Sequence, residues 1–289
     1  MDKFVVSDLK KLYLPPKDSH KGQNGRLTII GGSKLFHGAS LWALKVASRI
    51  VDMVFYSSIP ENNQIAQKLR SAIYDFIWVP REKIDSYIKE SDCVLIGPGM
   101  VRKEVRGSRF EVRGQNLREI NKIKDEGEQS YWLTKYLLNK YPTKKWVVDA
   151  GSLQMMEREW LKELKTQPIL TPHVKEFFKL FGVERVKKVK RVAKEYHCTI
   201  LLKGQTDIVC SPDQCKIVEG GNAGMTKGGT GDVLAGLVAA FYCKNEAFLS
   251  ACAASFINKK AGEELFEKVG YYFNASDLAD QIPRTMKNS

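Results

Sequence analysis

Residues 26–57 read RLTIIGGSKLFHGASLWALKVASRIVDMVFYS, and this stretch decides the fold of the chain. Arg26–Gly32 predicts a strand, because an apolar, β-rich run ends in two glycines that favour a turn. Ala39–Val51 predicts a helix, because its apolar residues recur at helical spacing. Met53–Ser57 predicts another strand. Strands that alternate with helices in this way are typical of an α/β fold around a largely parallel sheet.

Four further strands are predicted, and each one runs into glycine, proline or polar residues. They are Cys93–Ile96 before Gly97-Pro98-Gly99, Trp146–Val148 before Asp149-Ala150-Gly151, Ile169–Leu170 before Thr171-Pro172-His173, and Thr199–Leu202 before Lys203-Gly204. The carboxyl ends of parallel strands form the binding crevice of open α/β sheets. We therefore expect the functional residues to collect at these junctions.

The junction at Thr171 also predicts the start of a helix. Thr171 would be the cap residue and Pro172 the first helical residue. His173 would then lie in the first turn, at a strand end, facing the crevice. Taken alone, a single histidine at such a position favours a structural role over a contact with substrate.

The chain predicts a single domain over residues 1–289, because no Gly/Ser-rich linker and no repeat divides it. Val101–Ser130 interrupts the alternation, since it is charged and has only scattered apolar residues. We expect an irregular excursion near residues 101–130, part helix and part exposed loop, before a helix at Tyr131–Lys140. This excursion could be a lid or an oligomer contact.

The composition excludes several classes of protein. Of the 289 residues, 43% are hydrophobic and 27% are charged, as in soluble globular proteins. No apolar run approaches the roughly 18 residues of a membrane-spanning helix, and the N-terminus is too polar for a signal peptide. A cytoplasmic location is therefore expected. The six cysteines lack metal-like spacing and are expected to be reduced, although Cys210 and Cys215 weakly permit a disulfide.

The net charge of +13 is consistent with nucleic acid, an acidic membrane surface or a phosphate-rich substrate. The densest basic run, Arg185–Lys194, has six basic residues in ten. Val186, Val189 and Ala193 recur within it at helical spacing, which predicts an amphipathic helix with a solvated basic face. No aromatic residues alternate with the basic ones, so the run does not favour stacking on nucleic-acid bases.

The strongest chemical signal is NAGMTKGGTGDVLA, residues Asn222–Ala235. Glycines just before a helix allow a tight turn that aims N–H groups outward, and these groups with the helix dipole bind anions. Asp232 in the first turn could simply cap the helix, but a cap does not require GGTG before it. A loop that cradles phosphate beside a carboxylate can stabilise charge and remove a hydroxyl proton. The stretch therefore predicts a nucleotide-using enzyme with Asp232 as its acid–base residue.

This loop matches neither the dinucleotide-binding nor the Walker motif. It resembles the anion-hole and catalytic-aspartate motif of the ribokinase-like superfamily. Six ordered motifs narrow the resemblance to the ADP- or ATP-dependent NAD(P)H-hydrate dehydratase family. They are HKGQNGRLTIIGGSKLFHGAS (His20–Ser40), LIGPGM (Leu95–Met100), VVDAGSL (Val147–Leu153), TPHVKEFFKLFG (Thr171–Gly182), LLKGQTDIV (Leu201–Val209) and NAGMTKGGTGDVLAG (Asn222–Gly236). The resemblance runs from about His20 to Pro283.

The resemblance implies a ribokinase-like three-layer sandwich, with a mostly parallel central sheet and helices on both faces. It implies a repair enzyme that returns hydrated NADH or NADPH (NAD(P)HX) to NAD(P)H. ADP or ATP, with Mg²⁺, would phosphorylate the ring hydroxyl, and phosphate would then be eliminated. The expected partners are these small molecules, with no nucleic acid and no membrane. A homo-oligomer is expected, and any epimerase would be a separate protein.

The resemblance also assigns roles to residues of this chain. Substrate contacts carry over to Ala39, Gly99, His173 and Asp232, with Asp232 catalytic. Nucleotide contacts carry over to Lys203, Gly204, Gln205, Thr206, Asp207, Asn222 and Gly231. The anion hole would consist of Gly228, Gly229, Thr230 and Gly231. Glu176 is either a surface charge or a residue that organises Mg²⁺ through water.

The chain departs from the family pattern in two places beside the long excursion. Arg49–Met53 stands where the family has a glycine-rich turn, and Ile59–Phe76 lacks a clear form of the family's small proline–glutamate element. The nearest alternative is a ribokinase-like kinase of a small alcohol, such as a thiazole or a hydroxymethylpyrimidine. The TPHVKEF element and the GGS…GAS pair favour the dehydratase. A basic nucleic-acid-binding protein is a remote alternative.

Overall fold

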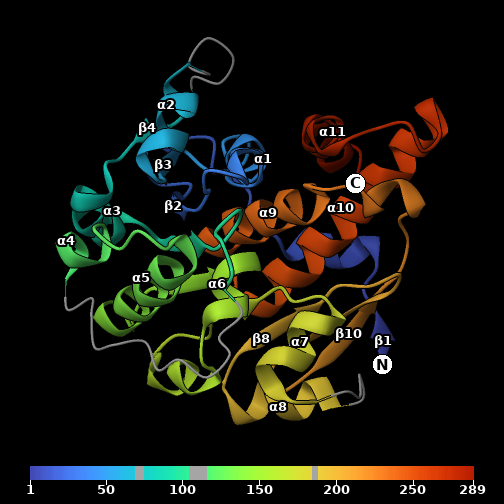
Figure 1. Cartoon of the computed structure of the whole chain (residues 1–289). Coiled ribbons are helices and arrows are strands. Elements are labelled where there is room, and N and C mark those ends of the chain that lie inside the picture. The colour runs from blue at the N-terminus through green and yellow to red at the C-terminus, as the bar shows by residue number, and fades with distance from the viewer. Residues whose placement is uncertain (69–74, 104–115, 184–187) are drawn as a thin grey trace.

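The computed structural model describes residues 1–68, 75–103, 116–183 and 188–289 (Figure 1). The described strands form one ten-stranded sheet. Their bounds are β1 Asp2–Lys3, β2 Arg26–Ile30, β3 Met53–Ser57, β4 Ile77–Trp78, β5 Cys93–Ile96, β6 Lys145–Val148, β7 Ile169–Leu170, β8 Thr199–Leu202, β9 Asp207–Cys210 and β10 Cys215–Val218.

The strand order across the sheet is β1-β10-β9-β8-β7-β6-β5-β2-β3-β4. β9 runs antiparallel to β8 and β10, and all other neighbouring strands are parallel. The carboxyl ends of β2 to β8 therefore lie along one edge, which is where open α/β sheets bind their ligands.

Helices cover both faces of the sheet. Their bounds are α1 His37–Ala47, α2 Pro60–Lys68, α3 Ile84–Glu90, α4 Leu117–Ile120, α5 Glu126–Lys140, α6 Ala150–Met155, α7 Val174–Phe181, α8 Val189–Glu195, α9 Thr230–Lys244, α10 Ala247–Val269 and α11 Ala275–Lys287. One core joins the sheet to α1, α9, α10 and α11, and the other joins it to α3 through α8. Leu27 and Ile29 belong to the first core and Ile30 to the second, because successive side chains of a strand point to opposite faces. The predicted three-layer α/β fold is confirmed.

The predicted bounds of the first helix were wrong by a few residues. The helix α1 covers His37–Ala47, and the chain turns after it instead of continuing to Val51. The N–H groups of Arg49 and Ile50 donate to carbonyls three residues back, at 3.2 and 2.9 Å, and these tight bonds end the helix.

The second half of the predicted excursion is helical. Residues 104–115 lie outside the described residues, and α4 and α5 follow them. The helix predicted at Tyr131 begins earlier, at Glu126. Asp125 caps it, since its Oδ1 accepts a hydrogen bond of 2.8 Å from the Glu128 N–H. The charged residues that concealed this first turn from the sequence pattern lie beside the cap, where acidic groups favour a helix start.

The helix after Thr171 also starts elsewhere than predicted. His173, and not Thr171, is the N-cap, and Val174 is the first helical residue of α7. Thr171 is unavailable because its hydroxyl donates to Asp149 Oδ1 at 2.8 Å. The chain stays extended through His173, which pairs with Lys203 beyond the end of β8. The placement of His173 in the first turn was therefore wrong by one residue.

The basic run forms α8 in the part that the structure describes. Val189 and Ala193 are buried there, as the amphipathic pattern predicted, while Val186 lies outside the described residues. Among the described helices, none combines the length and apolar composition that crossing a bilayer requires.

The prediction that all cysteines are reduced was wrong for one pair. Cys210 and Cys215 form a disulfide. The antiparallel pairing of β9 and β10 places these two residues directly opposite each other, with Cα atoms 4.2 Å apart. Cys93, Cys198, Cys243 and Cys252 are free and buried.

Candidate active site

The loop before α9 requires glycine at its last position. Gly229 is the N-cap of α9 and has a φ of 96°, a conformation that other residues rarely adopt. A Cβ at this position would lie 2.4 Å from the ring of Trp42. No side chain caps the helix. The Thr230 N–H donates to the Lys227 carbonyl at 3.4 Å. The N–H groups of Gly231 and Asp232 have no capping side chain from Gly229, so they can bind an anion, which the helix dipole also favours.

Two polar side chains hold this loop in shape. The Thr230 hydroxyl donates to the carbonyls of Met225 and Lys227, at 2.6 and 2.9 Å. Asn222 accepts from the Gly224 N–H at 2.9 Å and donates to the Gly262 carbonyl of α10 at 2.8 Å. The side chains of Thr230 and Asn222 therefore shape the loop from within, whatever their main chains bind.

Asp232 lies in the first turn of α9 among other charged groups. Burial raises the pKa of Asp232 to about 7, and the negative charge of Asp149 adds to this shift, while the Lys203 ammonium opposes it. A carboxyl group with such a pKa exchanges its proton near neutral pH, as a general base must. The carboxyl group also interacts with its own main-chain N–H, but its raised pKa and its position near Asp149 and Lys203 favour an acid–base role over a cap alone.

Lys203 connects the ends of three neighbouring strands. Its Nζ lies 2.9 Å from Asp149 Oδ1, and Asp149 is 2% exposed. Burial lowers the pKa of Lys203, but the charges of Asp149, Glu176 and Asp232 outweigh burial and raise the pKa above its usual value. Lys203 therefore stays positively charged. A Cβ built on Gly231 would lie 3.7 Å from Lys203 Nζ, so this ammonium flanks the α9 N-terminus.

Asp149 was not among the predicted site residues, although the VVDAGSL motif contains it. Asp149 directly follows β6, as Lys203 follows β8, and Asp149 accepts hydrogen bonds from both Lys203 and Thr171. Its position at a strand end was the signal that could have identified it.

His173 and Glu176 form a reciprocal cap at the start of α7. The Glu176 N–H donates to His173 Nδ1 at 3.1 Å, and the His173 N–H donates to Glu176 Oε2 at 2.9 Å. Gln154 donates to the other carboxylate oxygen at 2.6 Å. Glu176 is 7% exposed, so it is not a simple surface charge. The cap holds the imidazole, which is half exposed, next to the Lys203 main chain.

A cavity of about 470 Å³ opens beside the α9 N-terminus. Of the residues predicted to bind nucleotide, all but Thr206 line it, namely Lys203, Gly204, Gln205, Asp207, Asn222 and Gly231. Thr206 is exposed on the same turn between β8 and β9. The structure thus brings two distant segments of the sequence together around one space.

Two residues of α10 that the sequence analysis missed belong to this cavity. Lys259 is 6% exposed and donates to the carbonyls of Gly204, Gln205 and Gly220, at 3.3, 2.9 and 3.3 Å. Its Nζ also lies 3.5 Å from Asp207 Oδ1. Asn258 is next to it, and its buried Oδ1 has no hydrogen-bond partner among the described residues. They interrupt an alanine-rich helix, which was the available signal.

Asp207 is engaged by the protein itself. Its Oδ1 accepts from the Gly204 N–H at 2.8 Å, and its Oδ2 accepts from the Ser255 hydroxyl at 2.7 Å. Its carboxylate therefore closes the β8–β9 turn against α10.

Ala39 and Gly99 lie together, at a second position along the crevice. A Cβ on Gly99 would lie 3.0 Å from Ala39 Cβ and 2.4 Å from the Phe36 carbonyl oxygen. Gly99 is buried and has a φ of 73°. Trp42 connects this position to the α9 loop, because its ring contacts the sites of both Gly38 and Gly229. The Trp42 side chain therefore lies between the predicted substrate position at Ala39 and the loop before Asp232.

The donor set around Asp232 fits a hydrated Mg²⁺ better than a metal ion held by protein alone. No group of three or more His, Cys, Asp or Glu side chains among the described residues is arranged to hold a metal. Asp149, Glu176 and Asp232 nevertheless act together on Lys203. Mg²⁺ typically keeps several waters and binds through one or two carboxylates and the phosphates of a substrate.

The fold and this site define a class of protein, α/β proteins of the ribokinase-like fold with a candidate ligand site at the carboxyl edge of the sheet. The description of the matching family model is NAD(P)H-hydrate dehydratase, and the match covers residues 27–284. The chain belongs to the NAD(P)H-hydrate dehydratase family.

Curated relatives of two lengths resemble the chain. It is 35% identical to the bifunctional NAD(P)H-hydrate repair enzyme Nnr of Methanocaldococcus jannaschii over 97% of this chain and 52% of that protein. It is 32% identical to the ADP-dependent (S)-NAD(P)H-hydrate dehydratase of Cenarchaeum symbiosum, over 99% of this chain and 97% of that protein. The chain thus spans about half the length of the bifunctional relatives.

A solved structure shares the fold. The ADP/ATP-dependent NAD(P)H-hydrate dehydratase of Bacillus subtilis, co-crystallised with ATP/Mg²⁺, superimposes with a TM-score of 0.78 at 21% identity, over 99% of this chain and 98% of that chain.

Proposed function

We propose that this chain is a nucleotide-dependent dehydratase that repairs hydrated NADH and NADPH. One observation carries the proposal: Asp232, with a pKa near 7, lies at an uncapped helix N-terminus beside a cavity of about 470 Å³. A carboxyl group there can accept a hydroxyl proton while main-chain N–H groups stabilise phosphoryl oxygens. Family membership supplies the identity of the alcohol, a hydrated nicotinamide ring.

The first step is phosphoryl transfer. Asp232 takes the proton of the ring hydroxyl while the hydroxyl oxygen forms a bond to the terminal phosphorus of the nucleotide. The bond between that phosphorus and the bridging oxygen of the nucleotide breaks, and the shortened nucleotide leaves with the electron pair. We expect the amides of Gly228, Gly229, Thr230 and Gly231 to face the phosphoryl oxygens. Lys203 would lie beside them, since a Cβ on Gly231 would be 3.7 Å from its Nζ. Catalysis of this kind is mostly positioning and electrostatic stabilisation.

The second step is elimination. The ring carbon–oxygen bond breaks and phosphate leaves with the electron pair. The adjacent ring carbon loses a proton to water, and the electron pair of that carbon–hydrogen bond forms the double bond of the dihydronicotinamide. Phosphorylation makes this possible because phosphate is a far better leaving group than hydroxide. The same main-chain groups that stabilised the transferring phosphoryl can hold the departing phosphate.

ADP or ATP is the proposed co-substrate, held by Lys203, Gly204, Gln205, Thr206, Asp207, Asn222 and Gly231. Mg²⁺, when bound, would neutralise charge on the phosphates. Asp149 and, through water, Glu176 would hold it. Ala39, Gly99 and His173 are proposed to contact the hydrated nucleotide. A homo-oligomeric state, a cytoplasmic location and a separate epimerase stay predictions.

The test is an assay with chemically hydrated NADH, Mg²⁺ and either ADP or ATP. We expect the absorbance of NADH to recover with at least one nucleotide and not without nucleotide. A parallel assay with ATP and hydroxyethylthiazole checks the kinase alternative. Phosphorylation of the thiazole, with no recovery of NADH from either nucleotide, would overturn the proposal.

A further inference from the structure

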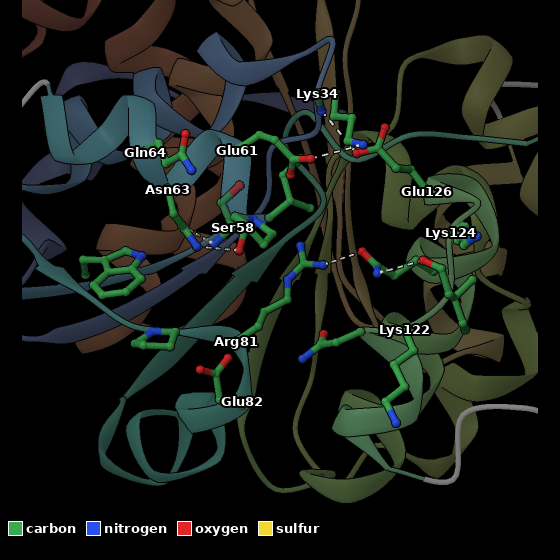
Figure 2. Close-up of a pocket in the computed structure, with 17 residues that line it drawn as sticks. Lys34, Ser58, Glu61, Asn63, Gln64, Arg81, Glu82, Lys122, Lys124 and Glu126 are labelled. Carbon is green, nitrogen blue, oxygen red and sulfur yellow. Dashed lines mark hydrogen bonds and ion pairs between the residues drawn. The ribbon is translucent and has the colours of Figure 1, made fainter.

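A second cavity lies away from Asp232, where β3 and β4 end. Its volume is about 820 Å³, larger than that of the cavity beside the α9 N-terminus. Figure 2 shows its walls, which come from the β2–α1 loop, the start of α2, the β4–α3 junction and the segment between α4 and α5. None of the roles assigned above involves this cavity.

Arg81 is the central cation of this cavity. It is 7% exposed and lines the space (Figure 2). Its Nη1 donates to Gln129 Oε1 at 2.8 Å, and its Nε has no hydrogen-bond partner. Within the described ranges it forms no ion pair with a carboxylate. Burial lowers the pKa of Arg81 to about 10, so it stays charged at neutral pH. The charge of Glu126 acts on Arg81 without forming an ion pair with it. A buried cation with no carboxylate in direct contact is costly, and an anionic ligand would relieve that cost.

The other charged groups leave the centre of the cavity positive. Lys122 and Lys124 line the wall across from Arg81 in Figure 2, and both are exposed. Two carboxylates on the upper wall are already engaged by Lys34. Glu61 pairs with its ammonium at 3.1 Å, and Glu126 accepts from its N–H at 3.2 Å. Glu82 is exposed to solvent.

Trp78 gives the same cavity an aromatic surface. It is half buried, and it lies at the end of β4, three residues before Arg81. An aromatic ring next to Lys and Arg side chains is the combination that binds a nucleobase together with its phosphate.

The cavity lies next to the position of Ala39 and Gly99. Ser58 lines the cavity and donates to the Gly31 carbonyl at 2.5 Å. Asn62 donates to Ser58 at 2.8 Å and to Ser40, the neighbour of Ala39, at 3.4 Å. One thin hydrogen-bonded wall therefore separates the second cavity from the predicted substrate position.

The distance along the crevice suits a dinucleotide. Asp149 follows β6, and β5, β2 and β3 lie between β6 and β4. Four strand spacings of about 4.8 Å put roughly 19 Å between the reaction centre and the end of β4. A single nucleotide does not bridge such a span, whereas an extended dinucleotide does.

We propose that the Arg81 cavity binds the adenylate half of the dinucleotide substrate, with Arg81, Lys122 and Lys124 toward its phosphates and Trp78 toward its base. The inference rests on the proposed function and identifies the part of the substrate farthest from the reacting ring. Binding energy from a remote group of this kind raises kcat/KM without taking part in the chemistry.

The test compares hydrated NADH with hydrated reduced nicotinamide mononucleotide, which lacks the adenylate. Arg81→Met should lower kcat/KM for hydrated NADH about 100-fold, and Lys122→Gln with Lys124→Gln about tenfold, mostly through KM. Neither change should alter kcat/KM for the mononucleotide more than about twofold. Lys190→Gln with Lys194→Gln, the same charge change on exposed residues of α8, is the matched control and should leave both substrates unaffected.

Several results would overturn the inference. Equal losses on both substrates mean that the cavity does not distinguish the adenylate, and unchanged rates on both mean that it is not used. Free adenylate is the other source of the same chemistry. Loss of AMP binding in the double-lysine variant, with unchanged kcat/KM for hydrated NADH, would assign the cavity to a separate nucleotide and overturn the inference.

The exposed lysines keep the test valid should Arg81→Met fail to fold. The same assays separate this inference from the proposed function. Wild-type enzyme that converts neither substrate defeats the proposed function, whereas turnover of both with insensitive variants defeats only the inference.

Discussion

The cations of the two cavities along the crevice have contrasting surroundings. At the nucleotide end, Lys203 is paired with Asp149, and Lys259 is surrounded by three carbonyls and Asp207. At the other end, Arg81 is equally buried but has one neutral partner, Gln129, among the described residues. The first end is therefore organised before any ligand binds. The second holds a cation that no carboxylate of the described residues contacts directly, although the charge of Glu126 acts on it, and an anionic ligand could pair with it. The paired cations suit a reaction centre, whose charges must be held in place before the reaction begins. Arg81 suits the binding of an anionic group.

The largest expected effect is a loss of turnover at the end of the crevice beside α9, with its structure unchanged. Asp232→Asn should lower kcat by about 10³-fold or more, because the hydroxyl proton loses its acceptor. Nucleotide affinity should stay within about threefold, since the carboxyl group is not part of the predicted nucleotide contacts. Turnover assays and calorimetric titration with ADP measure the two quantities, and a near-normal kcat would remove Asp232 from the mechanism.

The next effect concerns stability and compares the two cations directly. Lys259→Met should lower the free energy of unfolding by about 3–5 kcal/mol, because it leaves a buried carboxylate and three carbonyls without their partner. Arg81→Met should change it by less than about 1 kcal/mol, since no buried counter-ion is orphaned. Urea denaturation of both variants without ligand measures the difference. Equal losses would contradict the contrast between the two ends.

A smaller effect follows from the raised pKa of Asp232. The folded state holds this proton up to about pH 7, whereas the unfolded chain loses it near pH 4, so the carboxyl group destabilises the fold increasingly between these values. Asp232→Asn should therefore stabilise the ligand-free protein by about 1–3 kcal/mol at pH 8 and by much less at pH 5. Thermal or urea unfolding at the two pH values checks this. An equal gain at both would mean that the pKa is not raised.

The smallest effect tests the role of Asp149 in setting that pKa. The rate at low substrate should rise with pH as Asp232 ionises, with a midpoint near 7 in the wild type. Asp149→Asn removes a negative charge that raises this pKa, so the midpoint should fall by about one unit. A pH profile of kcat/KM measures it, and Glu157→Asn, on the exposed rim of the α6 side, serves as the control. A midpoint that rises would contradict the assignment.

The sequence predicted the sheet better than it predicted the helix ends. β3, β5, β7 and β8 have the predicted bounds because each is a short, mostly apolar run that a glycine or a polar residue follows. α5 starts earlier than predicted because the charged residues of its first turn do not follow the apolar pattern. α7 starts later because a tertiary contact occupies Thr171, so that His173 is the cap. The Thr171 hydroxyl does not cap α7 because it donates to Asp149. Asp149 is distant in the sequence, so the residues around Thr171 do not reveal this hydrogen bond.

The candidate site was predictable where its residues follow one another in a motif. The loop at Gly228–Asp232 could be read locally, since glycine conformation and a helix start are local properties. Lys259 and Arg81 could not, because a buried cation is recognised only by the carbonyls and carboxylates around it, and these come from distant parts of the chain. The Cys210–Cys215 disulfide escaped for the same reason, since it depends on the pairing of β9 with β10.

The position of α9 in the core has a consequence for the newly made chain. Asp232 and the phosphate loop lie at the start of α9, which packs with α1 against the middle of the sheet. The ribosome therefore delivers Ala39 in α1, and Gly99 and Lys203 beyond β5 and β8, before the group that is proposed to activate the hydroxyl. Because domains fold as units, a nascent or truncated chain that ends before α9 would hold part of the crevice but lack the carboxyl group that is proposed to activate the hydroxyl.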